Sequence, residues 1–262
     1  NYANQNSNYS IKINHAIGLR SYYEANVFHS TTDYSQFLFE DPLDPNYVRT
    51  DWIDTEPSSA TFVFGGTQMG HSYRKSNSLG GKFDFTSQIT SKHEIKIGTS
   101  VRIDNLNEEN ITVLYNDQYR TPTVLPANES PYHNLYDNEA TFLSGYIQDK
   151  IEYANMIMNV GLRYDYFDPK SDYVENLLDP EGSKITADPK HMVSPRLGIS
   201  FPITDEGILH FSYGHFFQMP TLRRLYKTSI FGAGLAPSIG YADLKPEKTV
   251  NYEFGLQQQL TN

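Results

Sequence analysis

Few residues of this chain stand in an arrangement that could perform chemistry. The eight histidines are scattered, and none has a second histidine and a third ligand at metal-binding spacing. No nucleophile stands in a motif with a general base. Two oxygen-rich segments, Asp41–Asn46 and Asp104–Asn110, carry ligand types that calcium prefers but lack the spacing of an EF-hand, and the adjacent Glu108 and Glu109 do not converge. We interpret both segments as solvated loops and expect no catalytic site, no cofactor and no metal site.

Two charged residues are more informative about function than the histidines and the oxygen-rich segments. They lie within Met156–Asp168, where polar and apolar residues alternate. Arg163 and Asp165 share one side with Asn159 and Gly161, while an apolar row occupies the other. Alternation with a period of two indicates an extended strand, because successive side chains point to opposite faces. The two charged residues therefore share a face. They could contact a polar solute, or they could neutralise each other.

The same alternation recurs along the chain and indicates a protein built from strands. Six more segments show it clearly and two show it less regularly. No segment has a convincing helical period, so we expect about nine strands and no helix. The regular segments are Ile11–Leu19, Leu79–Thr86, Ile95–Ile103, Val193–Phe201, Leu209–Gly214 and Val250–Gln257, and the less regular ones are Tyr22–Tyr34 and Ala140–Tyr153.

The connections between these strands alternate strictly between short and long. The short ones are Gly18–Ser21, Ile89–Lys92, Tyr153–Asn155 and Pro202–Gly207, and the long ones are Ser35–Gly70, Asn116–Asn138, Pro169–Lys190 and Gln218–Pro246. Long connections at every second position are unusual in a compact soluble domain. They are typical of a bacterial outer-membrane barrel, which has tight turns on the periplasmic side and long loops outside.

Composition narrows the possible functions. A net charge of −10 disfavours a general nucleic-acid binder. Hydrophobic content is low at 38% and aromatic content is high at 14%, and no apolar run reaches the ~18 residues of a membrane-spanning helix. The N-terminus has no signal-peptide pattern, and we expect the chain to be a piece of a longer protein.

The two faces of the strands indicate which medium each one meets. Charged residues run along the polar rows, as in a water-filled lumen, whereas the apolar rows suit hydrocarbon and end in aromatics typical of a girdle, namely Tyr164, Tyr166, Tyr213, Phe217 and Tyr252. Strands in lipid require a closed barrel, so about nine of them would need partners from outside this chain. A soluble sandwich or jelly roll is the alternative, and Pro195 within an apolar row counts slightly in its favour.

Four segments resemble the TonB-dependent outer-membrane receptor family. They are Y-G-H-F-F-Q-M-P-T-L-R-R-L-Y (Tyr213–Tyr226), L-K-P-E-K-T-V-N-Y-E-F-G (Leu244–Gly255), S-P-R-L-G-I-S-F (Ser194–Phe201) and G-Y-I-Q-D-K-I (Gly145–Ile151). The resemblance implies an all-β fold, an antiparallel transmembrane β-barrel, of which residues 1–262 form a partial barrel. It also implies a plug domain that is not in this chain and contacts the TonB complex.

The resemblance further implies a multi-pass protein of the Gram-negative outer membrane, in contact with lipid. Its expected role is energy-coupled uptake of a small, scarce solute such as a siderophore, cobalamin or an oligosaccharide. A passive porin-like barrel and a soluble β-sandwich adhesin are the alternatives. Candidate solute-binding residues are those on the polar rows and the aromatics of the long loops: Arg163, Asp165, Arg196, Glu253, Trp52 and Tyr226.

Overall fold

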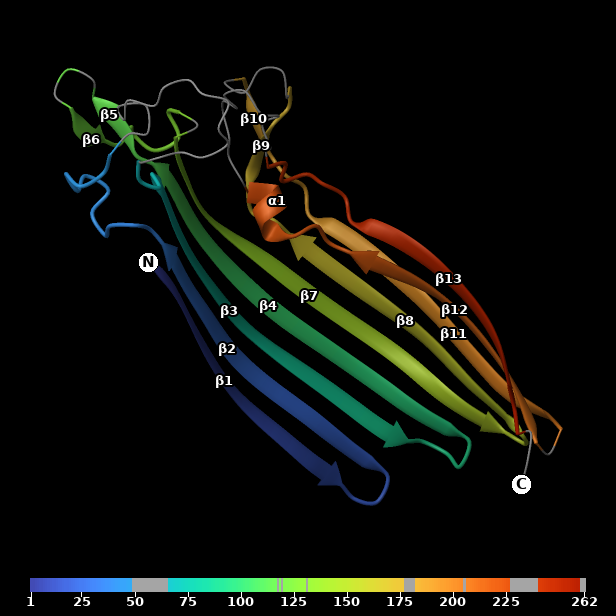
Figure 1. Cartoon of the computed structure of the whole chain (residues 1–262). Coiled ribbons are helices and arrows are strands. Elements are labelled where there is room, and N and C mark those ends of the chain that lie inside the picture. The colour runs from blue at the N-terminus through green and yellow to red at the C-terminus, as the bar shows by residue number, and fades with distance from the viewer. Residues whose placement is uncertain are drawn as a thin grey trace.

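Nine long strands form one antiparallel sheet in the computed structural model, in the order in which they occur along the chain (Figure 1). The structure describes residues 1–48, 66–116, 118, 120–130, 132–176, 182–204, 206–226 and 240–259. The strands are β1 (Tyr2–Ile17), β2 (Ser21–Gln36), β3 (Gly70–Gln88), β4 (His93–Thr112), β7 (His133–Tyr153), β8 (Met156–Asp168), β11 (Lys190–Thr204), β12 (Gly207–Gln218) and β13 (Glu247–Gln258). The expected all-β fold and strand number are confirmed.

Small additional elements lie in the long connections. Two hairpins, β5 (Leu114–Asn116) with β6 (Thr121–Thr123) and β9 (Asp172–Val174) with β10 (Lys184–Thr186), and one helix, α1 (Leu222–Tyr226), lie at the loop end of the sheet, opposite the tight turns (Figure 1). The expected asymmetry of the connections is confirmed. The expectation of no helix was wrong at α1, since five residues are too few for a helical period to show in a sequence.

Residues Asp104–Asn110 belong to β4, so their interpretation as a loop was wrong. They pair with β3 on one side and β7 on the other, and both ladders continue to Ile111. This part of β4 carries polar side chains on both faces. The same composition is typical of a loop, which explains the error.

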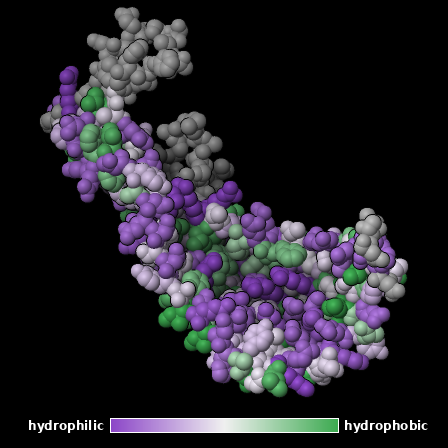
Figure 2. All heavy atoms as spheres, turned by 60° about the horizontal axis from the view of Figure 1, so that its bottom comes forward, coloured by the Kyte–Doolittle hydropathy of each residue, from purple (hydrophilic) through white to green (hydrophobic). Residues whose placement is uncertain are grey.

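The sheet is strongly curved, with an apolar convex face and a polar concave face. Figure 2 shows a hollowed molecule with hydrophobic residues at several places along its convex outline. Residues of the convex face are exposed although apolar, among them Ile97, Val101, Leu143, Ile147, Val160 and Leu162. Within the described residues no second sheet packs against this face, so the strands do not form a β-sandwich. Strands β1 and β13 are the two edges, and the sheet does not close on itself.

One buried apolar cluster lies at the loop end of the sheet. It joins residues of four neighbouring strands to the helix: Leu106, Tyr136, Ala140, Phe167, Met192, Leu225 and Tyr226. Phe217 packs against this cluster, although the sequence placed it in the lipid-facing row. The ladder between β12 and β11 ends at the pair Arg196–Gly214, next to Pro195, which has no N–H to donate, so the end of β12 that carries Phe217 is not paired with β11.

Gly98 makes room for a hydrogen bond that crosses three strands. It lies on β4 between Asp84 of β3 and Tyr146 of β7, and the Tyr146 hydroxyl donates to the Asp84 carboxylate above it. A Cβ atom at this position would overlap both side chains. We therefore expect Gly98→Ala to lower the free energy of unfolding by about 1–3 kcal/mol, the usual cost of overpacking.

Gly145 is the matched control for this substitution. A Cβ atom there would meet nothing closer than 3.9 Å, the distance to the Gly98 carbonyl oxygen, so Gly145→Ala should not lower stability. Urea unfolding of both variants in detergent, followed by the gel mobility shift of folded barrels, measures the difference. Equal midpoints for the two variants would contradict the expected overlap.

Candidate functional site

The concave face brings two of the six predicted site residues into direct contact. Arg163 and Asp165 are neighbours on the same face of β8, and the arginine donates to the carboxylate from Nε at 2.8 Å and from Nη2 at 2.6 Å. Both side chains are about one-third exposed or less. They neutralise each other, which was the second of the two roles considered for them.

Arg196 lies on β11 close to this pair but is not joined to it. Its guanidinium carbon lies 4.9 Å from the centre of the Phe216 ring on β12. Arg163 and Arg196 line the same cavity of about 420 Å³ in the concave face. The structure therefore brings these two arginines to one recess, although they are 33 positions apart in the chain.

The other predicted wall residue, Glu253, does not line this recess, although Ser212, its partner on β12, does. It is exposed on the edge strand β13, where the Ser212 hydroxyl donates to it over a long 3.5 Å. Trp52 lies outside the described residues.

Tyr226 was expected as an exposed loop aromatic, but the structure buries it at 3% exposure. Its hydroxyl donates to the carbonyl oxygen of Pro169 over 2.8 Å. Burial raises the pKa of this phenol, so the hydroxyl keeps its proton and remains a donor at neutral pH. Tyr226 fixes α1 to the β8–β11 connection and presents little surface to a solute.

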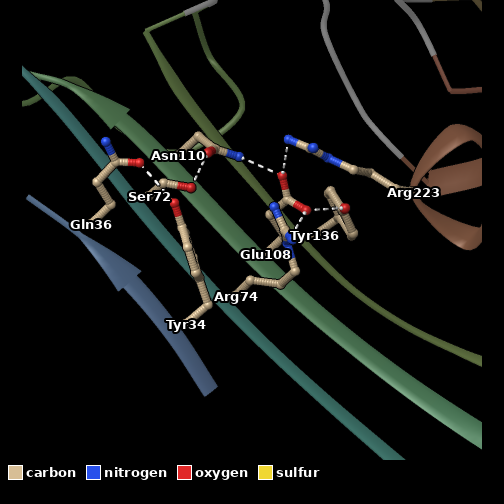
Figure 3. A network of polar contacts seen from close by, with 8 residues as sticks. All are labelled: Tyr34, Gln36, Ser72, Arg74, Glu108, Asn110, Tyr136 and Arg223. Carbon is tan, nitrogen blue, oxygen red and sulfur yellow. Dashed lines mark hydrogen bonds and ion pairs between the residues drawn. The ribbon is translucent and has the colours of Figure 1, made fainter. Parts of the chain in front are cut away.

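The most extensive polar network of the concave face centres on Glu108 of β4 (Figure 3). Its carboxylate is 1% exposed and accepts from four groups: Arg74 Nε at 3.2 Å, Asn110 Nδ2 at 3.0 Å, Tyr136 Oη at 2.8 Å and Arg223 Nη2 at 2.8 Å. A buried carboxylate needs such partners, because its loss of hydration is otherwise very costly.

The role of Glu108 was not predicted from the sequence, although the chain carries a signal for it. Glu108 continues the alternation of Lys96, Gly98, Ser100 and Arg102 on the same face of β4. Extending that alternation past Ile103 would have placed Glu108 on the polar row. Its partner Arg223, 115 positions later, is not predictable from any local pattern.

The connection between β12 and β13 thus docks on the concave face at two places. Around α1, Arg223 contacts Glu108, and Leu225 and Tyr226 are buried. Further along, Asp243 forms an ion pair with Lys190 of β11, and the Tyr241 ring packs edge-on against Tyr173 at 4.8 Å between ring centres. This connection therefore covers part of the concave face at the loop end of the sheet.

Removing the Tyr226 hydroxyl should loosen this docking. Tyr226→Phe keeps the buried ring but leaves the Pro169 carbonyl without its donor, a loss of about 1 kcal/mol. We expect limited proteolysis within residues 219–246 to become roughly fivefold faster, since cleavage follows the population of the released state. Tyr132→Phe, at an exposed position of another long connection, is the control and should leave the cleavage rate unchanged. An unchanged rate in Tyr226→Phe would contradict the role assigned to its hydroxyl.

The concave face contains no cluster suited to a metal ion among the described residues. Nor does that part of the chain contain a helix long and apolar enough to cross a membrane. The wall offers paired charges, hydrogen-bonding side chains and a recess lined by Arg163 and Arg196. Such a surface can bind and orient a polar solute.

Known proteins share this architecture. The family model described as "TonB dependent receptor-like, beta-barrel" matches residues 1–262. A curated relative, the TonB-dependent heme receptor A of Haemophilus ducreyi, is 28% identical over 153 residues, which is 55% of this chain and 18% of the receptor. The chain therefore spans less than one-fifth of that relative.

Solved structures show the same fold at low sequence identity. The copper transporter OprC has a TM-score of 0.62 at 14% identity, with 98% of this chain and 37% of the transporter covered. The FrpB iron transporter from Neisseria meningitidis has a TM-score of 0.59 at 14% identity, with 99% of this chain and 34% of the transporter covered.

Proposed function

Because this chain belongs to the TonB-dependent receptor β-barrel family, we propose that it forms part of the wall of an outer-membrane receptor that takes up a scarce solute. The proposal includes energy coupling through a plug domain and the TonB complex. It also includes closure of the barrel by further strands that pair with the edges β1 and β13, since unpaired strand edges are not tolerated in lipid.

One observation carries the proposal: a single curved sheet with opposite polarity on its two faces. The apolar residues of the convex face are exposed, whereas the concave face holds ion pairs such as Arg163–Asp165 and Lys82–Asp84. A wall with lipid on one side and a wet lumen on the other requires this arrangement. A soluble domain would bury the apolar face.

The solute is proposed to be an iron complex or a similar metal-containing compound. The relatives support this class by their names, which include a heme receptor, an iron transporter and a copper transporter. The docked connection between β12 and β13 lies where such a solute would first meet the wall. Cobalamin, a cobalt complex, falls within this class, whereas oligosaccharides do not.

Uptake by the full-length receptor tests the proposal. The receptor gene is expressed in a Gram-negative strain that lacks its own iron receptors, with and without tonB, and growth under iron limitation is measured with heme or a ferric siderophore supplied. We expect growth that depends on both the receptor and TonB. Uptake that continues without TonB would instead show the passive, porin-like alternative.

A further inference from the structure

The four arginines of the nine strands differ in whether they form an ion pair with the wall. Three of the four form ion pairs with a carboxylate of the wall itself: Arg74 with Glu108 at 3.2 Å, Arg102 with Asp104 at 3.1 Å, and Arg163 with Asp165 at 2.6 Å. Arg196 has no carboxylate partner among the described residues. Its guanidinium lies instead over the Phe216 ring, 4.9 Å from the ring centre.

The surroundings of Arg196 leave space next to its charge. On the neighbouring strands it is flanked by Gly161 of β8 and Gly214 of β12, and Gly198 follows on its own face of β11. A Cβ atom at Gly161 would meet nothing closer than 3.5 Å, and one at Gly198 nothing closer than 3.9 Å. Neither crowding within this part of the wall nor a positive φ requires glycine at these two positions.

The cavity beside Arg196 has the size and lining of a ligand site. It measures about 420 Å³ and is lined by further hydrogen-bonding side chains, namely Tyr146, Gln148, Asn159 and Asn251. This volume lies within the range of about 300–1,000 Å³ that is usual for small-molecule pockets. Glycine inside a strand often marks a place where a ligand approaches the backbone closely.

We propose that this cavity, the Arg196 recess, is a subsite for an anionic group of the transported solute, a carboxylate or a phosphate. The guanidinium is held against the Phe216 ring, which fixes its plane. Its N–H groups can then donate in parallel to two oxygens of one anion. The three other strand arginines pair with a carboxylate of the wall, whereas Arg196 pairs with the anionic group of the solute.

This inference rests on the proposed function, because it assumes that a solute passes along the wall. An acidic side chain from a protein segment that fills the lumen is the competing occupant. The open volume and the several hydrogen-bond donors of its lining, the cation Lys96 included, favour a small molecule, since they suit several orientations of a group that binds and leaves.

Binding of simple anions to the purified full-length receptor tests the proposal. Succinate and inorganic phosphate are the probes, uncharged succinamide is the neutral control, and affinity is measured by saturation-transfer NMR. We expect succinate to bind and succinamide not to bind. Arg196→Gln should weaken succinate binding by about tenfold or more, the change that follows the loss of a charge-assisted pair of hydrogen bonds.

Two further variants make the test specific. Arg102→Gln is the matched control, because Arg102 also stacks on an aromatic ring, Phe142 at 4.2 Å, but already has a wall carboxylate; its succinate affinity should stay within about twofold of the wild type. Gly161→Leu keeps the charge and fills the recess, so it should weaken binding as Arg196→Gln does.

Two results would overturn the proposal. One is equal succinate affinity in the wild type and Arg196→Gln. The other is a wild type that binds neither anion. If Arg196→Gln then also lowers the melting temperature of the full-length receptor, the occupant of the recess is a protein segment. Binding is measured without TonB, so a receptor that binds succinate through Arg196 but shows no TonB-dependent uptake would refute the proposed function alone.

Discussion

Leu162→Arg should prevent assembly of the receptor into the outer membrane. Leu162 lies on the convex face of β8 and is 50% exposed, and its partners on the adjacent strands are Ile147 and Pro195. An arginine near the bilayer midplane of a barrel costs about 2–4 kcal/mol, and no carboxylate lies directly opposite to offset this. Val160 is a poorer position for the test, because it lies opposite Asp149.

Asn159→Arg is the matched control, because it introduces the same charge on the same strand but on the concave face. It should be tolerated, since water and polar side chains surround it there. The amount of heat-modifiable, folded receptor in outer-membrane fractions reports assembly of each variant. Equal assembly of the two variants would show that the faces of β8 are assigned wrongly.

Glu108→Leu should strongly destabilise the concave wall. The substitution leaves Arg74 and Arg223 without their shared carboxylate and Tyr136 without its acceptor. Tyr136 is buried, so its hydroxyl loses its partner without gaining water, whereas the Arg74 and Arg223 side chains are 35% and 51% exposed and regain water; we therefore expect a loss of about 1–3 kcal/mol. Urea unfolding in detergent should show this loss, and proteolysis within residues 219–246 should become faster as α1 is released.

Glu109→Leu provides the comparison at the adjacent position. Glu109 is part of the other face of β4, where it pairs with His133 at 2.8 Å and its side chain is about one-third exposed. Loss of a partly solvated pair should cost less than about 1 kcal/mol. Arg223→Gln removes only the contact from α1, so it should accelerate proteolysis without the full loss of stability. A similar effect of the two glutamate substitutions would argue against the central position of Glu108.

The nine strands and their two faces could be predicted from the sequence alone, apart from the Asp104–Asn110 part of β4 and the side taken by Phe217. Alternation in segments such as Met156–Asp168 places every second side chain on one face by the geometry of the extended chain, with no reference to distant residues. Connection lengths are equally local, so the separation of tight turns and long loops was also predictable. The family resemblance rested on motifs of the same local kind, such as Leu244–Gly255.

The contacts between residues that are far apart in the chain could be known only from the tertiary structure. Glu108 meets Arg223 because a helix of five residues folds back onto the concave face, and no local pattern encodes that return. Phe217 and Tyr226 are aromatics in or next to a loop by sequence, yet both pack into the buried cluster. Arg163 finds its carboxylate two residues further along its own strand, as the alternation indicated. Only the register of the strands places Gly161 and Gly214 opposite Arg196 and so leaves it beside a cavity, because side chains on neighbouring strands become neighbours through hydrogen bonds formed far apart along the chain.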